Sequence, residues 1–364
     1  MPWADVLVVG LGPAGASAAA AAAQAGARVI AVDRRPVPGL PVQCAEFVPA
    51  LLSANTEAVR AAALQEIAAM ETFLGRDVPD HTPDFRGVMI DRAAFDAALV
   101  EEARAAGATI LCGTAFHGLH FGLAHLGHDM RIAVEVVVGA DGPRSTVGRL
   151  AGMANRDLVE TRQVTVPLLK PHNATDIFLT PDIMGGYGWL FPRGAEANLG
   201  LGVVPEARAR LKPLLDDLRR LLIAQGRIGG AQARLTGGAI PVGGICGLSG
   251  DLSGVPVLLS GDAAGLANPI TGAGINAAVL SGQMAGAAAA ALVAGSATAA
   301  QDYAEEVSDL FGPSLDLARR RRAELLDHYA RGSIPGADAL RRSWIAYGDY
   351  WRRDTIKREA REHA

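Results

Sequence analysis

The chain has 364 residues, half of them hydrophobic and a fifth charged, with a net charge of −4. This composition is typical of a folded globular chain and excludes a disordered one, and the length allows two domains or one large α/β unit. The slightly acidic balance gives no reason to expect a nucleic-acid partner.

The cysteines and the hydropathy exclude several other classes. Cys44, Cys112 and Cys246 are odd in number, far apart and without a CxxC pair, which supports neither disulfides nor a zinc site, so we expect no bound metal. The N-terminus lacks a basic leader, and no strongly apolar run of about twenty residues stands out, so we expect neither a signal peptide nor a membrane span. The expected location is therefore the cytoplasm.

The beginning of the chain has the pattern of a βαβ unit. The apolar run from Val6 to Val9 ends at a glycine and predicts a buried parallel strand. The small residues from Pro13 to Ala25 favour a helix that stops at Gly26, and residues 28–32 predict the second strand.

The later elements are of both kinds. Helices are predicted over 58–73, over 205–228 and from 276 onward. Residues 89–107 predict the end of a strand followed by a helix that Asp91 caps. The tail from 300 is predicted to be helical, with breaks near 312–313 and 332–336. Strands are predicted over 134–138, in an antiparallel group over 163–204, over 237–242 and over 255–259.

The tail is basic, because residues 317–364 carry twelve Lys or Arg against seven Asp or Glu. We interpret it as a solvated helical face, with a docking surface for an anionic membrane or an acidic partner as the alternative.

This order of elements predicts an α/β fold with a Rossmann-like nucleotide-binding domain of the three-layer ββα kind. An antiparallel-sheet domain for the substrate is inserted into it, and a helical C-terminal region follows. We assign 1–72, 87–156 and 250–300 to the first domain, 73–86 and 157–249 to the second, and 301–364 to the helical region.

The first glycine motif, Gly10-x-Gly12-x-x-Gly15, follows the first strand and opens the first helix. Its glycines allow the tight turn, the approach of a pyrophosphate and close helix–strand packing, while the helix N-terminus attracts the phosphate charge. Asp33, at the end of the second strand, can accept hydrogen bonds from ribose hydroxyls. A dinucleotide site is predicted here, with a ligand-free glycine turn as the alternative.

A second glycine-rich segment favours FAD over NAD. Gly261-Asp262 follows a buried strand, which places the carboxylate within reach of a ribityl hydroxyl. Gly272-Ala273-Gly274 then precedes a helix whose N-terminus can face the flavin, where the reduced ring is negatively charged. The alternative is an ordinary strand–loop–helix in which Asp262 caps the helix.

Further segments carry a family resemblance. They are Tyr187-x-Trp189-x-Phe191-Pro192 with Gly200-x-Gly202, Pro269-Ile270-Thr271-Gly272-x-Gly274-Ile275, the Arg92-containing helix start, and Asp141-Gly142-x-Arg144-Ser145. With the glycine motifs, these residues resemble the FAD-dependent geranylgeranyl reductase family, within the para-hydroxybenzoate hydroxylase-like flavoproteins, over roughly residues 4–286.

The resemblance implies that the nucleotide-binding domain is an FAD-binding domain. The implied cofactor-binding residues are Gly10, Gly12, Pro13, Ala14, Gly15, Asp33, Arg34, Cys44, Ala45, Arg92, Asp141, Gly261, Asp262, Gly272, Ala273, Gly274 and Ile275. For Arg144, a structural role in the turn is as plausible as cofactor contact.

Two regions are implied to face the substrate. Cys44 lies in Pro41-Val42-Gln43-Cys44-Ala45-Glu46, where the family has a Cys-Gly-Glu or related stretch beside the flavin and this chain has Ala45 for the glycine. Cys44 is the candidate catalytic residue, as proton donor, with water as the alternative donor and with a redox-reporting or a packing role as alternatives for the cysteine. Tyr187, Trp189 and Phe191 share one strand face, which forms either plain core or the wall of an apolar cavity beside the flavin.

The resemblance implies a flavin-dependent oxidoreductase that reduces a C=C bond of an apolar, isoprenoid-type substrate by hydride transfer from reduced flavin N5. The alternative is an FAD-dependent monooxygenase that hydroxylates an aromatic substrate, such as a Trp or Tyr side chain of a peptide during quinone-cofactor maturation. A halogenase is disfavoured, because halogenases need a lysine near the flavin. The only lysines here are Lys170, Lys212 and Lys357, and none lies in the N-terminal nucleotide-binding segments. A flavin-bearing electron carrier remains a non-enzymatic alternative. We expect NAD(P)H or a redox partner protein as electron donor, and peripheral membrane contact as an option for a lipid substrate.

Overall fold

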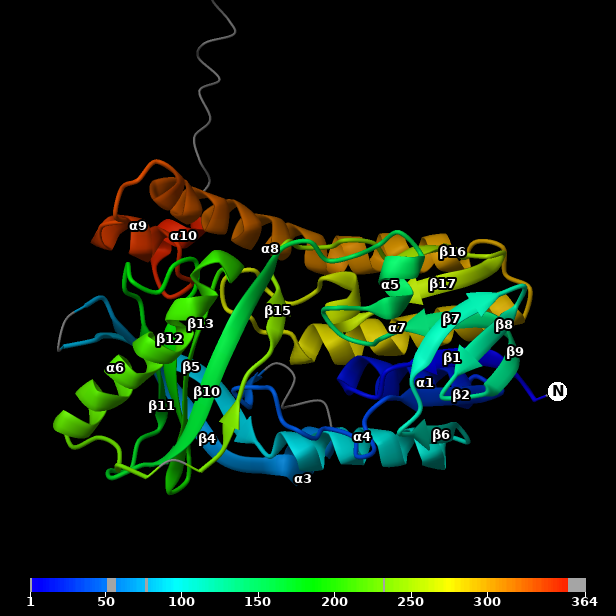
Figure 1. Ribbon diagram of the computed structural model, residues 1–364, viewed down its shortest axis with the longest axis horizontal. Coiled ribbons are helices and arrows are strands. Elements are labelled where there is room, and N and C mark those ends of the chain that lie inside the picture. The colour runs from blue at the N-terminus through cyan, green and yellow to red at the C-terminus, as the bar shows by residue number, and fades with distance from the viewer. Residues whose placement is uncertain (1, 51–56, 76–77, 232, 353–364) are drawn as a thin grey trace, which may run out of the picture.

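The computed structural model describes residues 2–50, 57–75, 78–231 and 233–352, and residues 353–364 of the basic tail lie outside them. The described chain forms two sheets that lie at opposite ends of an elongated molecule, with one long helix running along both (Figure 1).

The first sheet is the nucleotide-binding one. Its strands lie in the order β16-β17-β9-β1-β2-β6, and the neighbours from β17 to β6 are parallel. The strands are β1 (Trp3–Val9), β2 (Val29–Asp33), β6 (Thr109–Cys112), β9 (Met130–Gly139), β16 (Ser249–Leu252) and β17 (Val255–Leu259), with an antiparallel pair, β7 (Phe116–His120) and β8 (Leu123–Leu126), joined to β9. The predicted βαβ unit and the strands near 134–138 and 255–259 are confirmed.

Helices α1 (Pro13–Gln24), α4 (Arg92–Ala105) and α7 (Ile275–Val293) pack beside this sheet, and α1 contacts both of the others. Two glycines of α7 permit very close packing, because a Cβ at Gly282 or Gly286 would lie 2.2 Å from a backbone oxygen of α1. By length and composition α7 could cross a membrane, but half of the relevant window is buried and the helix packs on α1. In this fold it is a core helix.

The second sheet has the strand order β14-β10-β13-β12-β11-β4-β5-β3, with β15 paired to β10. The strands are β3 (Phe47–Pro49), β4 (Ala63–Phe73), β5 (Asp80–Ile90), β10 (Leu158–Pro167), β11 (Ala174–Phe178), β12 (Gly188–Arg193), β13 (Glu196–Val203), β14 (Leu235–Thr236) and β15 (Ala239–Pro241). Its strands are mainly antiparallel, as predicted for 163–204, and α6 (Leu211–Ala224) covers β10 and β13 behind a 3₁₀ turn, Pro205–Arg210.

One predicted helix is largely a strand. Only α3 (Glu57–Ala62) is helical, and Ala63–Phe73 forms β4. The alanine spacing that suggested a helix is overridden by pairing, since β4 is antiparallel to β5 and parallel to β11. β3 and β4 therefore both lie in the second sheet, β3 through its pairing with β5. From the sequence we expected residues 1–72 to belong to the nucleotide-binding domain.

The tail also differs from its prediction. Helix α8 (Ala299–Ala330) continues through Pro313, where we expected a break, and ends before Gly332 as expected. A proline inside a helix costs a hydrogen bond, but α8 is held on both sides of it by buried residues such as Val307 and Leu315. The arginine run is not wholly a solvated face either. Arg321 and Arg322 are buried, and they donate to carbonyls of the following segment and of Gly185.

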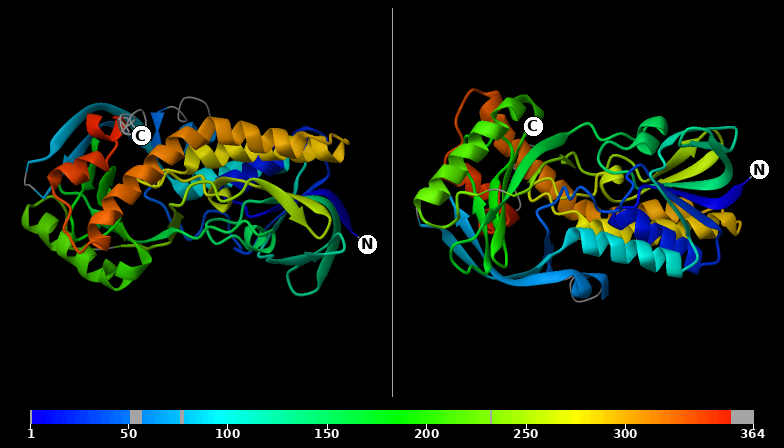
Figure 2. Two further views of the ribbon diagram at one scale, coloured as in Figure 1. Left: turned by 90° about the horizontal axis from the view of Figure 1, so that it is seen from above. Right: turned by 60° about the horizontal axis from the view of Figure 1, so that its bottom comes forward.

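The chain then turns back through α9 (Ala337–Arg342) and α10 (Gly348–Trp351), which lie beside the second sheet (Figure 2). Trp344, between these two helices, is buried and donates from Nε1 to the sulfur of Met70 on β4, 3.3 Å away.

Candidate functional site

The turn between β1 and α1 is shaped by its glycines. Gly10 is left-handed, with a φ of 100°. A Cβ at Gly15 would lie 1.8 Å from the oxygen of Gly10, so the turn and the helix require glycine for their own packing. A Cβ at Gly12 would meet nothing within 4 Å, so this position opens onto free space. The N-terminus of α1 also has no side-chain cap.

Asp33 ties this turn to the next strand. Its carboxylate accepts the backbone N–H of Leu11 at 2.8 Å and that of Arg35 at 2.7 Å. Each oxygen keeps a lone pair for a ribose hydroxyl. The neighbouring Arg34 is exposed.

A short 3₁₀ helix, Gly261–Ala264, follows β17 and carries Asp262. Burial raises the pKa of Asp262 to about 6, and Arg92 opposes this rise. Asn155 donates to the carbonyls of Asp262, at 2.8 Å, and Pro143, at 3.1 Å, and so joins the 141–145 segment to the segment that begins at Gly261.

Asp141 has a structural task in this geometry. It accepts the Ser145 hydroxyl and the Thr146 N–H at the start of α5 (Thr146–Leu150). Arg144 pairs with Glu160 of β10.

The loop before α7 is also organised by side chains. Asn268 accepts the N–H groups of Ile270, at 2.9 Å, and Thr271, at 3.0 Å, and Gly272 is left-handed. The helix then begins at Ile275 without a side-chain cap, and the buried Oδ1 of Asn276 has no hydrogen-bond partner among the described residues.

These features fit a bound FAD. Two uncapped helix N-termini, an open position at Gly12 and an orphaned amide oxygen call for a phosphate-bearing ligand with hydroxyl or N–H donors. The described residues hold no group of three or more His, Cys, Asp or Glu suited to a metal ion.

Cys44 and Arg92 lie together at the junction of the two sheets. Arg92 is the first residue of α4, and its Nε donates to Asp96 at 2.6 Å. Burial lowers the pKa of Arg92, but Asp96 and Cys44 act more strongly in the other direction and hold it above the ordinary value. The guanidinium therefore lies beside both the Asp96 carboxylate and the Cys44 sulfur.

The aromatic residues reach the same junction from β12, which carries Trp189 and Phe191, and from Tyr187 just before it. The ring centroids of Tyr187 and Trp189 lie 5.7 Å apart, and those of Trp189 and Phe191 6.4 Å. Tyr187 donates its hydroxyl to the carbonyl of Thr271 at 2.6 Å, which joins the second sheet to the loop before α7. Burial raises the pKa of Tyr187, and Cys44 adds to this rise, so the phenol is neutral.

The indole of Trp189 explains a glycine of the signature. A Cβ at Gly200 would lie 2.3 Å from the Trp189 ring, so the ring packs directly against the backbone of the facing strand residue. The Trp189 Nε1 donates to Gln163 Oε1 at 2.9 Å, and the Gln163 amide donates to the carbonyl of Cys44 at 3.1 Å. The strand that carries the aromatic residues is therefore linked to the cysteine through Gln163.

Sequence reasoning missed several residues of this site, including Gln163, Asn198, Asn155 and Trp344. A signal existed for two of them. Gln163 and Asn198 are polar residues inside strands that the sequence predicts, and both are buried. Buried polar side chains need hydrogen-bond partners, so such positions point to specific contacts.

The fold and the site define a class of protein, the FAD-dependent oxidoreductases, and the family model described as FAD dependent oxidoreductase matches residues 5–140. The chain is 34% identical, over 346 residues, to the digeranylgeranylglycerophospholipid reductase of Methanocella arvoryzae, covering 86% of this chain and 84% of that protein.

Within this class the chain belongs to the geranylgeranyl reductase family. A solved structure, the geranylgeranyl bacteriochlorophyll reductase-like protein of Thermoplasma acidophilum, superposes with a TM-score of 0.80 at 26% identity, covering 94% of this chain and 96% of that one. A probable FAD-dependent monooxygenase from Pseudomonas aeruginosa shares the fold alone, with a TM-score of 0.66 at 18% identity over 90% of this chain and 97% of that one.

Proposed function

We propose that this FAD-dependent oxidoreductase reduces C=C bonds of an isoprenoid-type, apolar substrate. The observation that carries the proposal is the hydrogen bond from the Tyr187 hydroxyl to the carbonyl of Thr271, which joins the aromatic residues to the loop before α7. The names of the relatives support it, since they are reductases of geranylgeranyl-bearing lipids.

The residues divide the work between them. The α1 and α7 N-termini, Asp33 and Asp262 hold the cofactor, which when bound in its reduced form supplies a hydride from N5 to one carbon of the double bond. The aromatic face of Tyr187, Trp189 and Phe191 orients the isoprenoid substrate and excludes water from it.

Cys44 is our candidate for the proton that the second carbon requires. Its thiol gives a proton as the C=C bond becomes C–C with two new C–H bonds, and water then returns the proton to the sulfur. The pair of electrons comes from NAD(P)H or from a redox partner protein, which restores the reduced flavin after each turnover. For a lipid substrate, we propose transient contact with the membrane surface.

An anaerobic turnover experiment tests the function. The FAD-loaded protein is photoreduced without oxygen and mixed with a digeranylgeranylglycerophospholipid, the substrate class that the relatives' names give. We expect flavin reoxidation and a product that has gained two hydrogens per reduced bond, seen by mass spectrometry, whereas the saturated lipid leaves the flavin reduced. A product that gains an oxygen atom, and only in air, would establish the monooxygenase instead.

The proton donor has its own matched pair of variants. Replacing Cys44 by alanine should lower the turnover rate by about a hundredfold, as expected for loss of a general acid. Replacing Cys112, which lies at the end of β6, should leave the rate unchanged.

A further inference from the structure

Glu46 occupies an unusual position for its residue type. Its φ is 71°, in the left-handed region that favours glycine, and its side chain is 1% exposed. A charged residue at a glycine-like backbone position inside a protein is costly twice over, in conformation and in desolvation. Such a residue persists where its side chain has a specific task.

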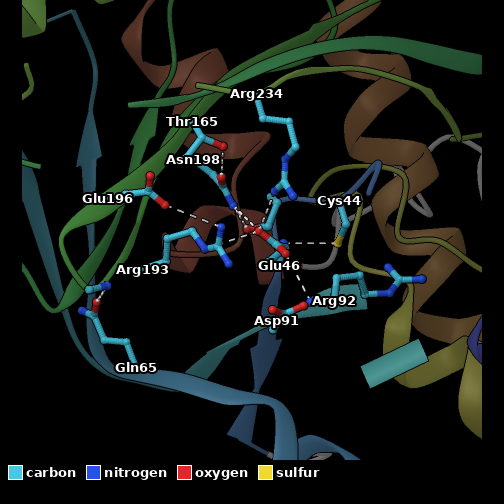
Figure 3. Close-up of polar contacts among 12 residues, drawn as sticks. Cys44, Glu46, Gln65, Asp91, Arg92, Thr165, Arg193, Glu196, Asn198 and Arg234 are labelled. Carbon is cyan, nitrogen blue, oxygen red and sulfur yellow. Dashed lines mark hydrogen bonds and ion pairs between the residues drawn. The ribbon is translucent and has the colours of Figure 1, made fainter. Parts of the chain in front are cut away.

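The carboxylate of Glu46 joins four segments (Figure 3). One oxygen accepts the backbone N–H of Arg92, at the start of α4, at 3.2 Å. The other accepts the Asn198 amide of β13 at 2.8 Å, and it lies 3.6 Å from Arg193 Nε on β12 and 3.4 Å from an Arg234 nitrogen just before β14. One buried carboxylate thus fastens the nucleotide-binding helix α4 to the second sheet.

The backbone around Glu46 is fixed by the same neighbours. The Glu46 N–H donates to the Cys44 sulfur at 3.2 Å, and its carbonyl accepts the Ile90 N–H at 2.9 Å. Asn198, which donates to the Glu46 carboxylate, also donates to the Ala45 carbonyl at 3.3 Å. The left-handed turn therefore points an N–H at the thiol, and the carboxylate keeps that turn in place.

We propose that Glu46 is a positioning residue that holds the Cys44 thiol beside Arg92 at the junction of the two sheets. The inference rests on the proposed function for the role of Cys44, but the placement of the thiol can be tested without it. Glu46 acts through its neighbours and touches neither substrate nor cofactor in this account.

The chain offers a matched control. Glu196 lies 3.9 Å from the same Arg193, but its side chain is 49% exposed and it makes no hydrogen bond to the Cys44–Glu46 segment among the described residues. The pair Glu46→Gln and Glu196→Gln removes one negative charge beside Arg193 in each case. Only the first change releases the turn.

The first measurement is alkylation of Cys44 by iodoacetamide in the FAD-loaded protein, followed by mass spectrometry with Cys112 as internal reference. We expect Glu46→Gln to change the rate of Cys44 modification by about tenfold or more, because a released turn alters both the exposure of the sulfur and its distance from the Arg92 guanidinium. Glu196→Gln should stay within about twofold of the unaltered protein. Equal Cys44 rates in all three proteins would overturn the proposal.

The second measurement separates positioning from mere stability. We expect Glu46→Gln to lower kcat for isoprenoid reduction by about a hundredfold with KM nearly unchanged, as for a displaced reacting group, and Glu46→Asp to recover part of the loss. If the unaltered protein reduces no isoprenoid, the proposed function fails while the alkylation result still decides the role of Glu46.

A third variant keeps the proposal testable if Glu46→Gln does not fold. Asn198→Ala removes the amide that holds Glu46 and Ala45 without changing any charge. It should also change the rate of Cys44 alkylation by more than the Glu196→Gln control does. An unaltered rate in a folded, FAD-bound Asn198→Ala protein would count against the proposal.

Discussion

Two glycines of one motif offer a test that separates packing from ligand binding. Gly12 has an extended backbone, with φ −73° and ψ −175°, and its Cβ direction is open. Alanine at this position is therefore compatible with the fold, and it should leave the stability of the FAD-free protein unchanged or raise it by up to about 1 kcal/mol through the unfolded chain. Gly15 differs, because a Cβ there would lie 1.8 Å from a backbone oxygen that cannot move aside cheaply.

The expected effect on FAD is the reverse. A methyl group at Gly12 occupies the space that the pyrophosphate needs next to the α1 N-terminus. Losing one or two charge-assisted hydrogen bonds to backbone N–H groups costs about 3 kcal/mol, which is roughly a hundredfold in Kd. We expect Gly12→Ala to bind FAD about a hundredfold more weakly while its FAD-free form melts normally. Gly15→Ala should lose about 1–3 kcal/mol of folding stability by overpacking.

The assay uses protein stripped of its flavin. Urea unfolding gives the stability of each FAD-free variant, and quenching of flavin fluorescence on titration gives Kd. If Gly12→Ala bound FAD as tightly as the unaltered chain, the open space at Gly12 would not be the phosphate site. If its FAD-free form unfolded at clearly lower urea, the position would not be open.

Three further changes follow from single contacts. Gly200→Ala should push the Trp189 ring aside and cost about 1–3 kcal/mol in urea unfolding, with altered tryptophan fluorescence, and native fluorescence would refute the close approach. Asp262→Asn should stabilise the FAD-free protein at neutral pH. Burial raises the pKa of Asp262 in the folded protein from 3.8 to about 6. Its contribution to folding stability is therefore complete below pH 3.8 and is lost as the pH rises through about 6. Compared with the unaltered protein, the variant should gain up to about 3 kcal/mol of folding stability above that range and nothing below it, measured by thermal unfolding across pH. Pro313→Ala should raise the free energy of unfolding by up to about 3 kcal/mol, and no gain would mean that α8 is not continuous there.

The parts of the fold that the sequence predicted are those with strong local signals. The glycine turn, the cap at Asp91 and the apolar strands β1, β9 and β17 are each specified by a few adjacent residues. The segment 63–73 is different, because its partners β5 and β11 are supplied from elsewhere in the chain and its alanines are compatible with either structure. The break predicted near Pro313 is wrong for the converse reason. Proline strongly disfavours a helix locally, but packing along the long helix α8 outweighs that preference.

In the candidate site, too, the sequence predicted the motif residues but not the residue that connects them. The motif residues Trp189 and Gly200 are one physical unit, an indole against a bare backbone, which explains why a signature pairs an aromatic residue with a distant glycine. What connects this unit to the cysteine is Gln163, which belongs to no motif and accepts from Trp189 while it donates to the Cys44 carbonyl. A change in the aromatic wall is therefore transmitted to the backbone that carries the thiol. We therefore expect the placement of the Trp189 ring and that of the thiol to be coupled, so variants at Trp189 should alter Cys44 alkylation in the absence of substrate.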